Sequence, residues 1–485
     1  MDEKEAGRQR TGVMAAAAAG LVAAAAMLWL LHARLLPLGV FGEWTWSQRD
    51  LPLLPAPAVL VAGLFILAGA VAALDAVRKD KIRRVQAVIG LLVLAIASYA
   101  LPQAMLVSEP AGYGRATLTV LSDLSMGYLS EASKMHAVRP WLQDTARRTN
   151  LGVVPARVAT HPPGPVLFFR LLSHVARKHP GLQRIVVAPL LIGSTKPDDV
   201  LAAAKRVSSG DLRFHHIAAA CLSIWVLGLA VPAAMLGTWL FAWWWLGARE
   251  ATTAAVLIGA VPALWVFTPG IDVRSASLTA FALAFWALAM RRQGWAWVAG
   301  IVWGLSLQWS YGLSALIVLF AGMWLVRGRP GGWRPWVGLI AGVVLAHLPL
   351  MLMGYRPLAN FLGAMAAQRT IMADRHYMPW LIMNAWDILL FSGPALVALA
   401  AAASGRARGL GTALLVTIAL LLLSGATRGE VGRIYCFLAP PLAVCAAAAM
   451  TVATESPFLL SGTVAIAAQL AAALGLGTYL MLVTP

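Results

Sequence analysis

Two carboxylates stand close together in the longest polar stretch of the chain. Residues 122–132 read SDLSMGYLSEA, so Asp123 and Glu131 are eight positions apart. In a helix this spacing places both side chains along one face, about two turns apart. We therefore expect both carboxylates to face a common cavity. The alternative is that Asp123 caps a helix and that Glu131 is only solvated.

A proline-rich elbow carries the next candidate, His161, in residues 160–165 (THPPGP). Two consecutive prolines hold His161 extended, Gly164 permits a sharp turn, and Pro165 suits the first turn of a helix. Residues 166–179 then predict an amphipathic helix in the membrane interface, whose N-terminus favours an anion. Its expected faces are Val166, Leu167, Leu171 and Val175 (apolar) against Arg170, Ser173, His174 and Arg177 (polar). The alternative is a structural turn with a surface histidine.

Two arginines flank a glutamate in residues 427–434 (TRGEVGRI), which contain Arg428, Glu430 and Arg433. A guanidinium group is planar and can bind phosphate through two N–H groups at once. The pattern predicts a phosphate clamp in which Glu430 orients either arginine, with Arg375 from an earlier polar segment as a further member. The alternative is a salt-bridged anchor, because arginines at the ends of membrane spans commonly extend toward water.

Two further polar residues follow apolar runs: Asp272 ends the motif PGID (269–272), and Tyr311 ends WSY (309–311). We expect both to line the same cavity, although Asp272 could equally cap a helix over 275–290. Cysteine chemistry is not indicated. Cys221, Cys436 and Cys445 lie in or beside apolar runs without a CxxC spacing, so neither a disulfide framework nor a zinc site is predicted.

The elements that must position these residues are membrane helices. Of the 485 residues, 60% are hydrophobic and 12% are charged, and the mean hydropathy is +0.76. A soluble domain has roughly 25% charged residues, so a soluble protein is excluded. A span needs about 20 apolar residues, and the sequence predicts an all-α integral membrane protein with about 13 transmembrane helices. A large external loop, 109–215, is expected to contain short interfacial helices.

The predicted spans are the apolar runs of the sequence, 11–32, 55–77, 86–107, 216–246, 251–268, 275–290, 295–308, 312–326, 336–354, 386–403, 410–424, 434–452 and 457–482. The region 295–326 has arginines at both ends, which favours a hairpin of two helices meeting near Trp309 over one long helix. Pro232 is expected to kink the run 216–246, because proline removes a helical hydrogen bond.

Basic residues are unevenly distributed between the two sides of this topology. With the N-terminus inside, sixteen Lys and Arg residues fall on that side, eight fall in the short loops opposite, and fourteen fall in 109–215. Short cytoplasmic loops carry such an excess, which predicts a cytoplasmic N-terminus and an external large loop. The net charge of +18 arises because most basic residues lie in the loops between predicted spans. A nucleic-acid partner is therefore not predicted.

The order of these motifs resembles the GT-C superfamily of polytopic membrane glycosyltransferases, and is similar to the dolichyl-phosphate-mannose mannosyltransferase type. The resemblance extends over most of residues 86–440. The resemblance rests on four motifs: Asp123 with Tyr128 and Glu131-Ala132, the elbow His161-Pro162-Pro163-Gly164, Pro269-Gly270-Ile271-Asp272, and Trp309-Ser310-Tyr311.

The resemblance implies transfer of a sugar from a polyprenyl-phosphate-linked donor to a glycan, lipid or protein acceptor. The reaction would take place on the extracytoplasmic side of a bacterial cytoplasmic (inner) membrane, with Asp123 as general base and with inversion at the sugar. His161 and Glu131 would position acceptor or sugar. Arg433, with Arg428 or Arg375, would neutralise the lipid phosphate. No acidic pair stands at Asp123, so no metal ligand set is predicted and a divalent cation, magnesium or manganese, stays an open question.

The expected organisation has three parts: two N-terminal helices (1–85), a catalytic membrane module with the external loop (86–335), and C-terminal helices with external loops 354–386 and 425–433 (336–485). Two other classes remain as alternatives, a polytopic transporter or lipid flippase and a membrane scaffold without activity. A transporter would more often place ionisable groups at the midplane of broken helices, whereas the polar residues of this sequence collect on one rim.

Overall fold

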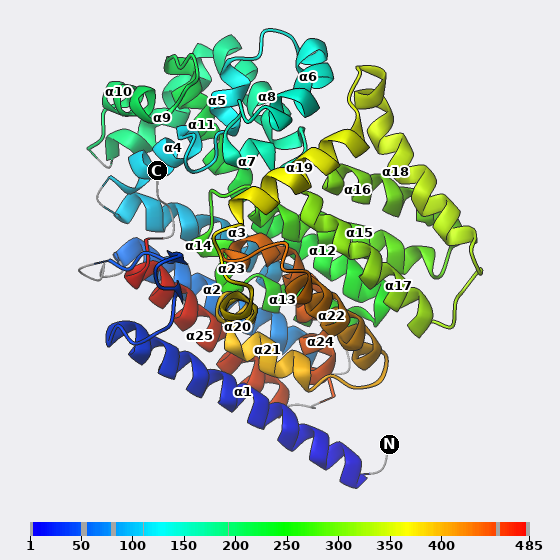
Figure 1. The fold of residues 1–485 in the computed structure, drawn as a ribbon. Coiled ribbons are helices and arrows are strands. Elements are labelled where there is room, and N and C mark those ends of the chain that lie inside the picture. The colour runs from blue at the N-terminus through cyan, green and yellow to red at the C-terminus, as the bar shows by residue number, and fades with distance from the viewer. Residues whose placement is uncertain are drawn as a thin grey trace.

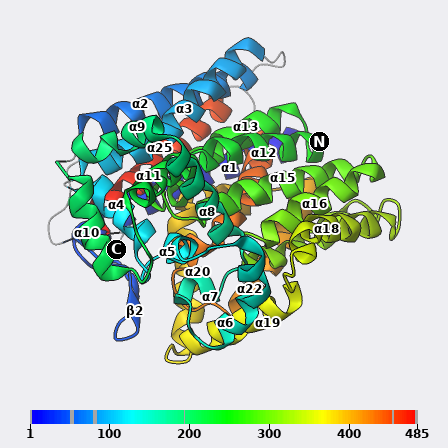
Figure 2. The same cartoon turned by 90° about the horizontal axis from the view of Figure 1, so that it is seen from above.

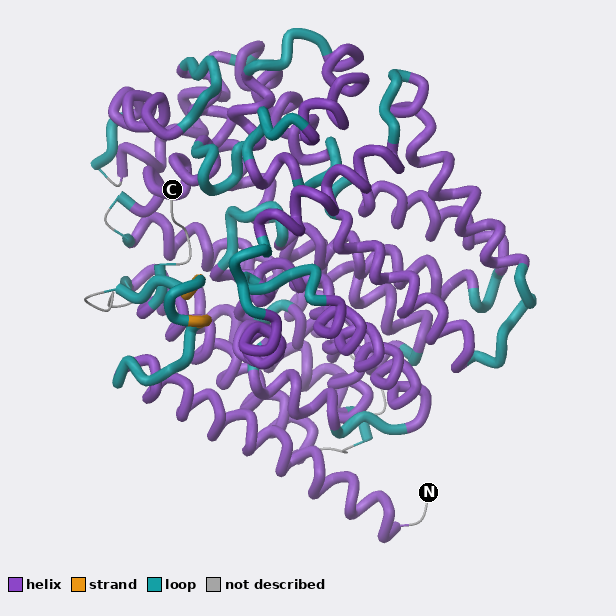
Figure 3. Tube along the Cα trace, in the orientation of Figure 1, coloured by secondary structure: helices purple, strands orange, loops and turns teal. Residues whose placement is uncertain are grey.

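The computed structural model describes residues 3–49, 56–78, 84–109, 111–192, 194–452 and 456–481. Most of them are helical, as Figures 1 and 3 show. Within these ranges the only strands are β1 (Gly39–Val40) and β2 (Trp44–Thr45), which pair antiparallel with Gly39 opposite Thr45. The predicted all-α class is therefore confirmed.

Eight helices in the described part of the chain are long and apolar enough to cross a membrane, and a bent helix pair would make a ninth span. The chain is thus a multi-pass membrane protein. The eight are Arg10–His32, Pro57–Arg78, Arg84–Ser108, Phe214–Trp245, Arg334–Leu352, Ala407–Ser424, Val431–Met450 and Pro457–Tyr479. Of the basic residues expected in the cytoplasm, Lys79, Lys81 and Arg83 lie outside the described residues.

Several predicted spans are not single helices. The run 386–403 falls on the bent pair, α20 (Tyr377–Ser392) and α21 (Pro394–Ala401), whose axes differ by 99°. Gly393 adopts a φ of 91°, which a helix does not allow, and Pro394 restarts the helix without needing an N–H partner. The run 251–268 is also divided, into α13 (Ala248–Ile258) and α14 (Pro262–Val266).

The two ambiguous regions of the sequence both contain breaks. The run 216–246 is interrupted at Leu229, near Pro232, and forms α11 (Phe214–Gly228) and α12 (Ala230–Trp245). The region 295–326 consists of two helices, as predicted, with 3₁₀ turns before each: η1 (Gln293–Trp295), α16 (Ala296–Leu307), η2 (Tyr311–Ala315) and α17 (Leu316–Val326). Trp303 closes the turn between them, because its Nε1 donates to the Leu313 carbonyl at 2.9 Å.

The remaining helices of the membrane body pack around one continuous apolar core. In Figure 1, α1 runs along α21 and α25, and α2 lies beside α3. Their bounds are α1 (Glu3–His32), α2 (Pro57–Arg78), α3 (Arg84–Ser108), α15 (Val273–Ala289), α18 (Arg334–Leu352), α19 (Pro357–Ile371), α22 (Gly405–Ser424), α23 (Val431–Ile434), η3 (Tyr435–Leu438), α24 (Ala439–Met450) and α25 (Ser456–Tyr479).

The segment between α3 and α11 folds into short helices gathered at one end of the body, the top in Figure 1. They are α4 (Gly112–Leu121), α5 (Tyr128–Ser133), α6 (Val138–Asn150), α7 (Ala156–Ala159), α8 (Gly164–Lys178), α9 (Pro180–Ile192) and α10 (Pro197–Val207). Together with α11 they enclose a second apolar core that includes Tyr128, Phe169 and Trp309. We name this segment, 111–213, the helical cap. In Figure 2 its α6 and α7 lie near α19, and contacts join α19 to both.

Glycines allow α16 and α18 to approach closely. A Cβ atom built on Gly342 of α18 would lie 2.0 Å from the backbone oxygen of Trp297, and one built on Gly300 would lie 2.0 Å from that of Leu339. Membrane helices often associate through such small residues, because these let the two backbones touch.

Replacing Gly342 with alanine should therefore separate α16 from α18 and lower the thermal unfolding midpoint of the detergent-solubilised protein. Overpacking of this kind costs about 1–3 kcal/mol. Gly63→Ala is the matched control, because Gly63 also lies inside a membrane helix and its added Cβ would meet nothing within 4 Å. Alanine has the higher helix propensity, so the control should be neutral or slightly stabilising. Equal midpoints for the two variants would contradict the close helix contact.

Candidate functional site

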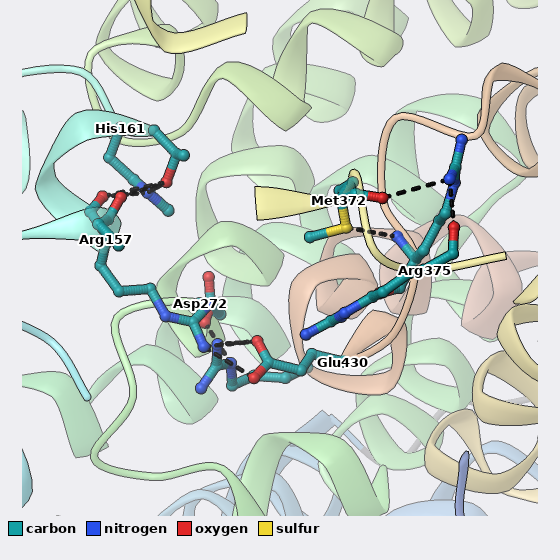
Figure 4. Close-up of polar contacts among 10 residues, drawn as sticks. Arg157, His161, Asp272, Met372, Arg375 and Glu430 are labelled. Atoms are coloured by element: carbon teal, nitrogen blue, oxygen red, sulfur yellow. Dashed lines mark hydrogen bonds and ion pairs between the residues drawn. The ribbon is translucent and has the colours of Figure 1, made fainter. Parts of the chain in front are cut away.

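Four charged side chains from three distant parts of the sequence meet beside α15 and α23 (Figure 4). Arg157 of the helical cap donates to both carboxylate oxygens of Glu430, at 2.8 and 2.5 Å. Arg433 donates to Glu430 Oε2 at 2.8 Å, and its Nε lies 2.9 Å from Asp272 Oδ2. The order Arg157, Glu430, Arg433, Asp272 alternates in charge, and we name these four side chains the charge network.

The backbone before α23 is shaped to present Glu430. Glu430 itself has a φ of 59° and Gly429 a φ of 95°, so two successive residues adopt the left-handed region. Asn384 of α20 holds this loop from behind: its Oδ1 accepts the Gly429 N–H at 3.0 Å, and its Nδ2 donates to the Thr427 carbonyl at 2.7 Å. Asn384, on the first helix of the bent pair, therefore fixes the loop that presents the Glu430 carboxylate.

Asp272 lies directly before α15, at the position where a helix-capping residue would stand. Its carboxylate makes no capping hydrogen bond and is instead ion-paired with Arg433. The interpretation of Asp272 as a helix cap is therefore wrong, because the nearby guanidinium is the stronger partner. The Asp272 side chain keeps 12% of its surface exposed, which allows contact with a bound molecule.

The electrostatics of Glu430 are set by its arginines. Burial by itself would raise the pKa of the Glu430 carboxyl, but Arg433, Arg157 and Arg375 outweigh it and hold the pKa at about 2. The carboxylate is therefore ionised at neutral pH. Arg157 and Arg433 share one negative charge in Glu430, and Asp272 supplies the second.

His161 lies one helical turn beyond Arg157 and is fixed in one tautomer. Its Nδ1 donates to the Arg157 carbonyl oxygen at 2.8 Å, since a carbonyl can only accept. Burial lowers the pKa of His161 to about 4, with Asp272 opposing the shift, so the imidazole is neutral at pH 7. Its Nε2 then carries a lone pair that can accept a hydrogen bond. The ring of Tyr128 meets His161 edge-on at 5.6 Å.

The elbow is anchored to the break between α16 and η2. The Gly164 N–H donates to the Gln308 carbonyl at 2.9 Å, and a Cβ on Gly164 would lie 2.1 Å from that oxygen. The helix predicted after the elbow is present as α8, with Pro165 in its first turn. Its predicted faces are partly wrong: Leu171 is 58% exposed, whereas Ser173 is buried and bonded to the Phe169 carbonyl. Phe169 and Leu172 are the side chains that α8 buries in the apolar core of the cap.

Arg375 and Arg428 clamp two loops to each other. Each guanidinium donates to the other residue's backbone carbonyl, and Arg428 also donates to the Met372 carbonyl at 3.3 Å. The Arg375 guanidinium lies over the rings of Trp44 and Trp380, at 5.8 and 5.7 Å from their centroids. Burial lowers the pKa of Arg375, and Glu430 opposes this effect.

Asp123 and Glu131 do not share one helical face, so that prediction is wrong. Gly127, with a φ of 70°, ends a turn that separates α4 from α5. The Asp123 carboxylate accepts hydrogen bonds from the Ser209 backbone N–H at 2.9 Å and from its hydroxyl at 2.5 Å. Glu131 is fully buried, where it accepts from Trp141 Nε1 at 2.8 Å and pairs with Arg148. Both carboxylates bind other parts of the cap.

Tyr311 also has a partner of its own. Its hydroxyl lies 3.1 Å from that of Tyr355, and its ring meets Phe361 of α19 edge-on at 5.4 Å. Of the nine residues singled out in the sequence, the structure joins Asp272, Glu430 and Arg433 directly and places His161 beside them.

Arg157 is the member of the site that sequence reasoning missed. Its only sequence signal is its position four residues before His161, which is one helical turn. The residues present do not form a carboxylate-held metal site, because Arg433 bridges Asp272 and Glu430. In the described part of the chain, no three His, Cys, Asp or Glu side chains are grouped closely enough to hold a metal ion.

Comparison with known proteins adds no assignment: no family model matches the chain, and a search of curated proteins finds no match.

Glu430→Gln should destabilise the protein strongly, because it leaves two half-buried arginines with a single carboxylate. Removing one partner of a buried ion pair typically costs about 3 kcal/mol or more. Thermal unfolding of Glu430→Gln, Arg157→Gln and the double variant measures the coupling, and the double variant should lose less than the sum of the two. Asp144→Asn is the control, since its partner Arg147 is 73% exposed, and it should change little. Additive losses would refute the pairing.

The protein should also lose stability as the pH falls from about 6.5 toward 4, through His161. The unfolded histidine, with a pKa near 6.5, takes up a proton in this range, whereas the folded one, with a pKa of about 4, does not. The pH dependence of the unfolding midpoint should be shallower in His161→Gln than in the wild type. His136→Gln, at an exposed position, is the control and should follow the wild type. Parallel curves for wild type and His161→Gln would contradict a buried neutral histidine.

Proposed function

We propose that this protein is a membrane glycosyltransferase that transfers a sugar from a polyprenyl-phosphate-linked donor to an acceptor on the extracytoplasmic side. The observation that supports this most is the charge network, which brings Arg157, Asp272 and Glu430 together from three segments expected on one side of the membrane. The cap and the loop before α23 are in direct contact through it. A polar cluster at the helix ends suits chemistry on a lipid head group at the membrane surface.

In the proposed reaction Asp272 is the general base. Its Oδ2 is paired with Arg433, which orients the carboxylate. Its second oxygen accepts the proton of the acceptor hydroxyl. The acceptor oxygen forms a bond to the anomeric carbon while the bond from that carbon to the phosphate oxygen breaks. The phosphate departs with the electron pair, and the anomeric centre is inverted. His161 Nε2, fixed by the Nδ1 bond to Arg157, accepts a hydrogen bond from sugar or acceptor.

This assignment moves the base from Asp123 to Asp272. Asp123 is held by Ser209, whereas Asp272 adjoins a guanidinium and a neutral imidazole. Arg375, whose guanidinium lies over the rings of Trp44 and Trp380 near Glu430, is bonded to a backbone carbonyl and adds only to the positive potential that the leaving phosphate meets. Enclosure of the cluster beneath the cap keeps water away from the sugar, which favours transfer over hydrolysis.

A transporter or lipid flippase is the second candidate, and one observation favours it. Asp387 is buried on the bent pair α20 and α21, where Trp46 Nε1 lies 3.3 Å from both of its carboxylate oxygens. Ionisable groups on broken membrane helices are typical of transport pathways. Substrate movement that depends on Asp387, without release of lipid phosphate, would support transport.

Asp272→Asn should reduce sugar transfer about 100-fold or more, because loss of a general base typically costs 10²- to 10⁴-fold. Purified protein is incubated with a panel of radiolabelled polyprenyl-phosphate sugars, and labelled product and released lipid phosphate are counted. Asp123→Asn is the matched control and should retain most of the activity.

Unfolding midpoints of both variants establish that they are folded. Loss of activity only in Asp123→Asn would return the base role to Asp123. If the wild type neither transfers sugar nor releases phosphate with any of the donors, the proposed glycosyltransferase function is refuted.

A further inference from the structure

Arg274 differs from the arginines of the charge network because no acidic group among the described residues neutralises it. In the described chain, no carboxylate or carbonyl oxygen accepts a hydrogen bond or ion pair from its guanidinium. The residue is half-buried. Its nitrogen atoms are absent from the fully buried, unpartnered polar atoms of the described chain. The guanidinium nitrogens therefore keep accessible surface that a bound molecule could contact. A half-buried positive charge without a counter-charge is costly unless a ligand supplies one.

Two aromatic rings hold this guanidinium in place. Its Cζ lies 4.9 Å from the ring centroid of Trp309 and 5.7 Å from that of Phe168. The two rings meet edge-to-face at 5.5 Å, and Trp309 Nε1 donates to the Ile271 carbonyl at 2.9 Å. Cation–π contacts of this kind position a guanidinium without neutralising it. Its N–H groups stay available for an oxyanion.

The surroundings of Arg274 indicate what carries that anion. The guanidinium lies where α8 of the cap meets α15 and the end of α16. Leu278, four residues after Arg274 on α15, is half-buried. Leu305, on α16 and four residues before Trp309, is 48% exposed. Leu171, one turn beyond Phe168 on α8, is also exposed. Each of the three helices therefore carries a leucine with accessible surface about one turn from a residue of this cation site.

We propose that Arg274 binds the phosphate of a polyprenyl-phosphate lipid whose chain lies along Leu278 and Leu305. The inference rests on the proposed function, because it takes its ligand class from the donor. A guanidinium binds phosphate through two parallel N–H groups, and the aromatic pair presents that fork in a fixed orientation. Arg274 stands two residues after Asp272, so a lipid phosphate here would lie close to the proposed base.

The test is binding of three probes to the full-length protein in phosphatidylcholine nanodiscs: a polyprenyl phosphate, phosphatidylglycerol and inorganic phosphate. Arg274→Gln should weaken polyprenyl phosphate binding about tenfold or more, because a hydrogen bond to a charged group contributes about 1.5–3 kcal/mol. Arg274→Lys keeps the charge without the fork and should fall between wild type and Arg274→Gln. Arg177→Gln, at an exposed position of α8, is the matched control and should bind as the wild type does.

Several outcomes would overturn this proposal. They are undiminished binding by Arg274→Gln, no binding of polyprenyl phosphate by the wild type, and an equal dependence of phosphatidylglycerol binding on Arg274. Inorganic phosphate should bind far more weakly than the lipid, since it lacks the chain, and equal affinity would refute the role of the leucines. Arg274-dependent lipid binding without sugar transfer would keep this site and remove the proposed enzyme, so the two failures are distinguishable.

Discussion

The ionised carboxylate of Glu430 is the constraint on which the site depends. Taking a carboxylate out of water costs several kcal/mol, and the attraction of nearby positive charges must offset that cost. Glu430 has Arg157 on one side and Arg433 on the other, and these arginines come from segments more than two hundred residues apart. The cap cannot leave the loop before α23 without exposing an uncompensated charge. One glutamate thus ties the polar cap to the membrane helices.

The arginines near the site differ in what they bind. Arg157 and Arg433 are neutralised by Glu430 and Asp272, so the charge network has no net charge when all four groups are ionised. Arg375 and Arg428 give hydrogen bonds to backbone carbonyls and close two loops. A doubly paired guanidinium is a poor receptor for a further anion. The arginines best placed in the sequence to bind phosphate are therefore mainly structural, and the available charge lies elsewhere.

The sequence predicted what depends on local pattern. Apolar runs identified the helical class, and the prolines of residues 160–165 identified the elbow and the start of α8. It could not predict that Asp123 bonds Ser209 or that Arg157 bonds Glu430, because such pairs depend on the path of the chain in space. The bend at Gly393 was also missed. A glycine followed by a proline permits continuation at a new angle, and only packing against Gln469 and its neighbours decides that angle.

The two carboxylates of the charge network stand at the starts of two helices. Asp272 immediately precedes α15, and Glu430 immediately precedes α23. Neither caps its helix, and both instead bind Arg433. The two helix starts are consequently held together by one side chain, with neutral His161 above them. The charge network can lie at the end of an apolar bundle because each of its four groups has a partner of opposite charge. No described residue supplies a counter-charge to the half-buried guanidinium of Arg274, and this is why a ligand is proposed there.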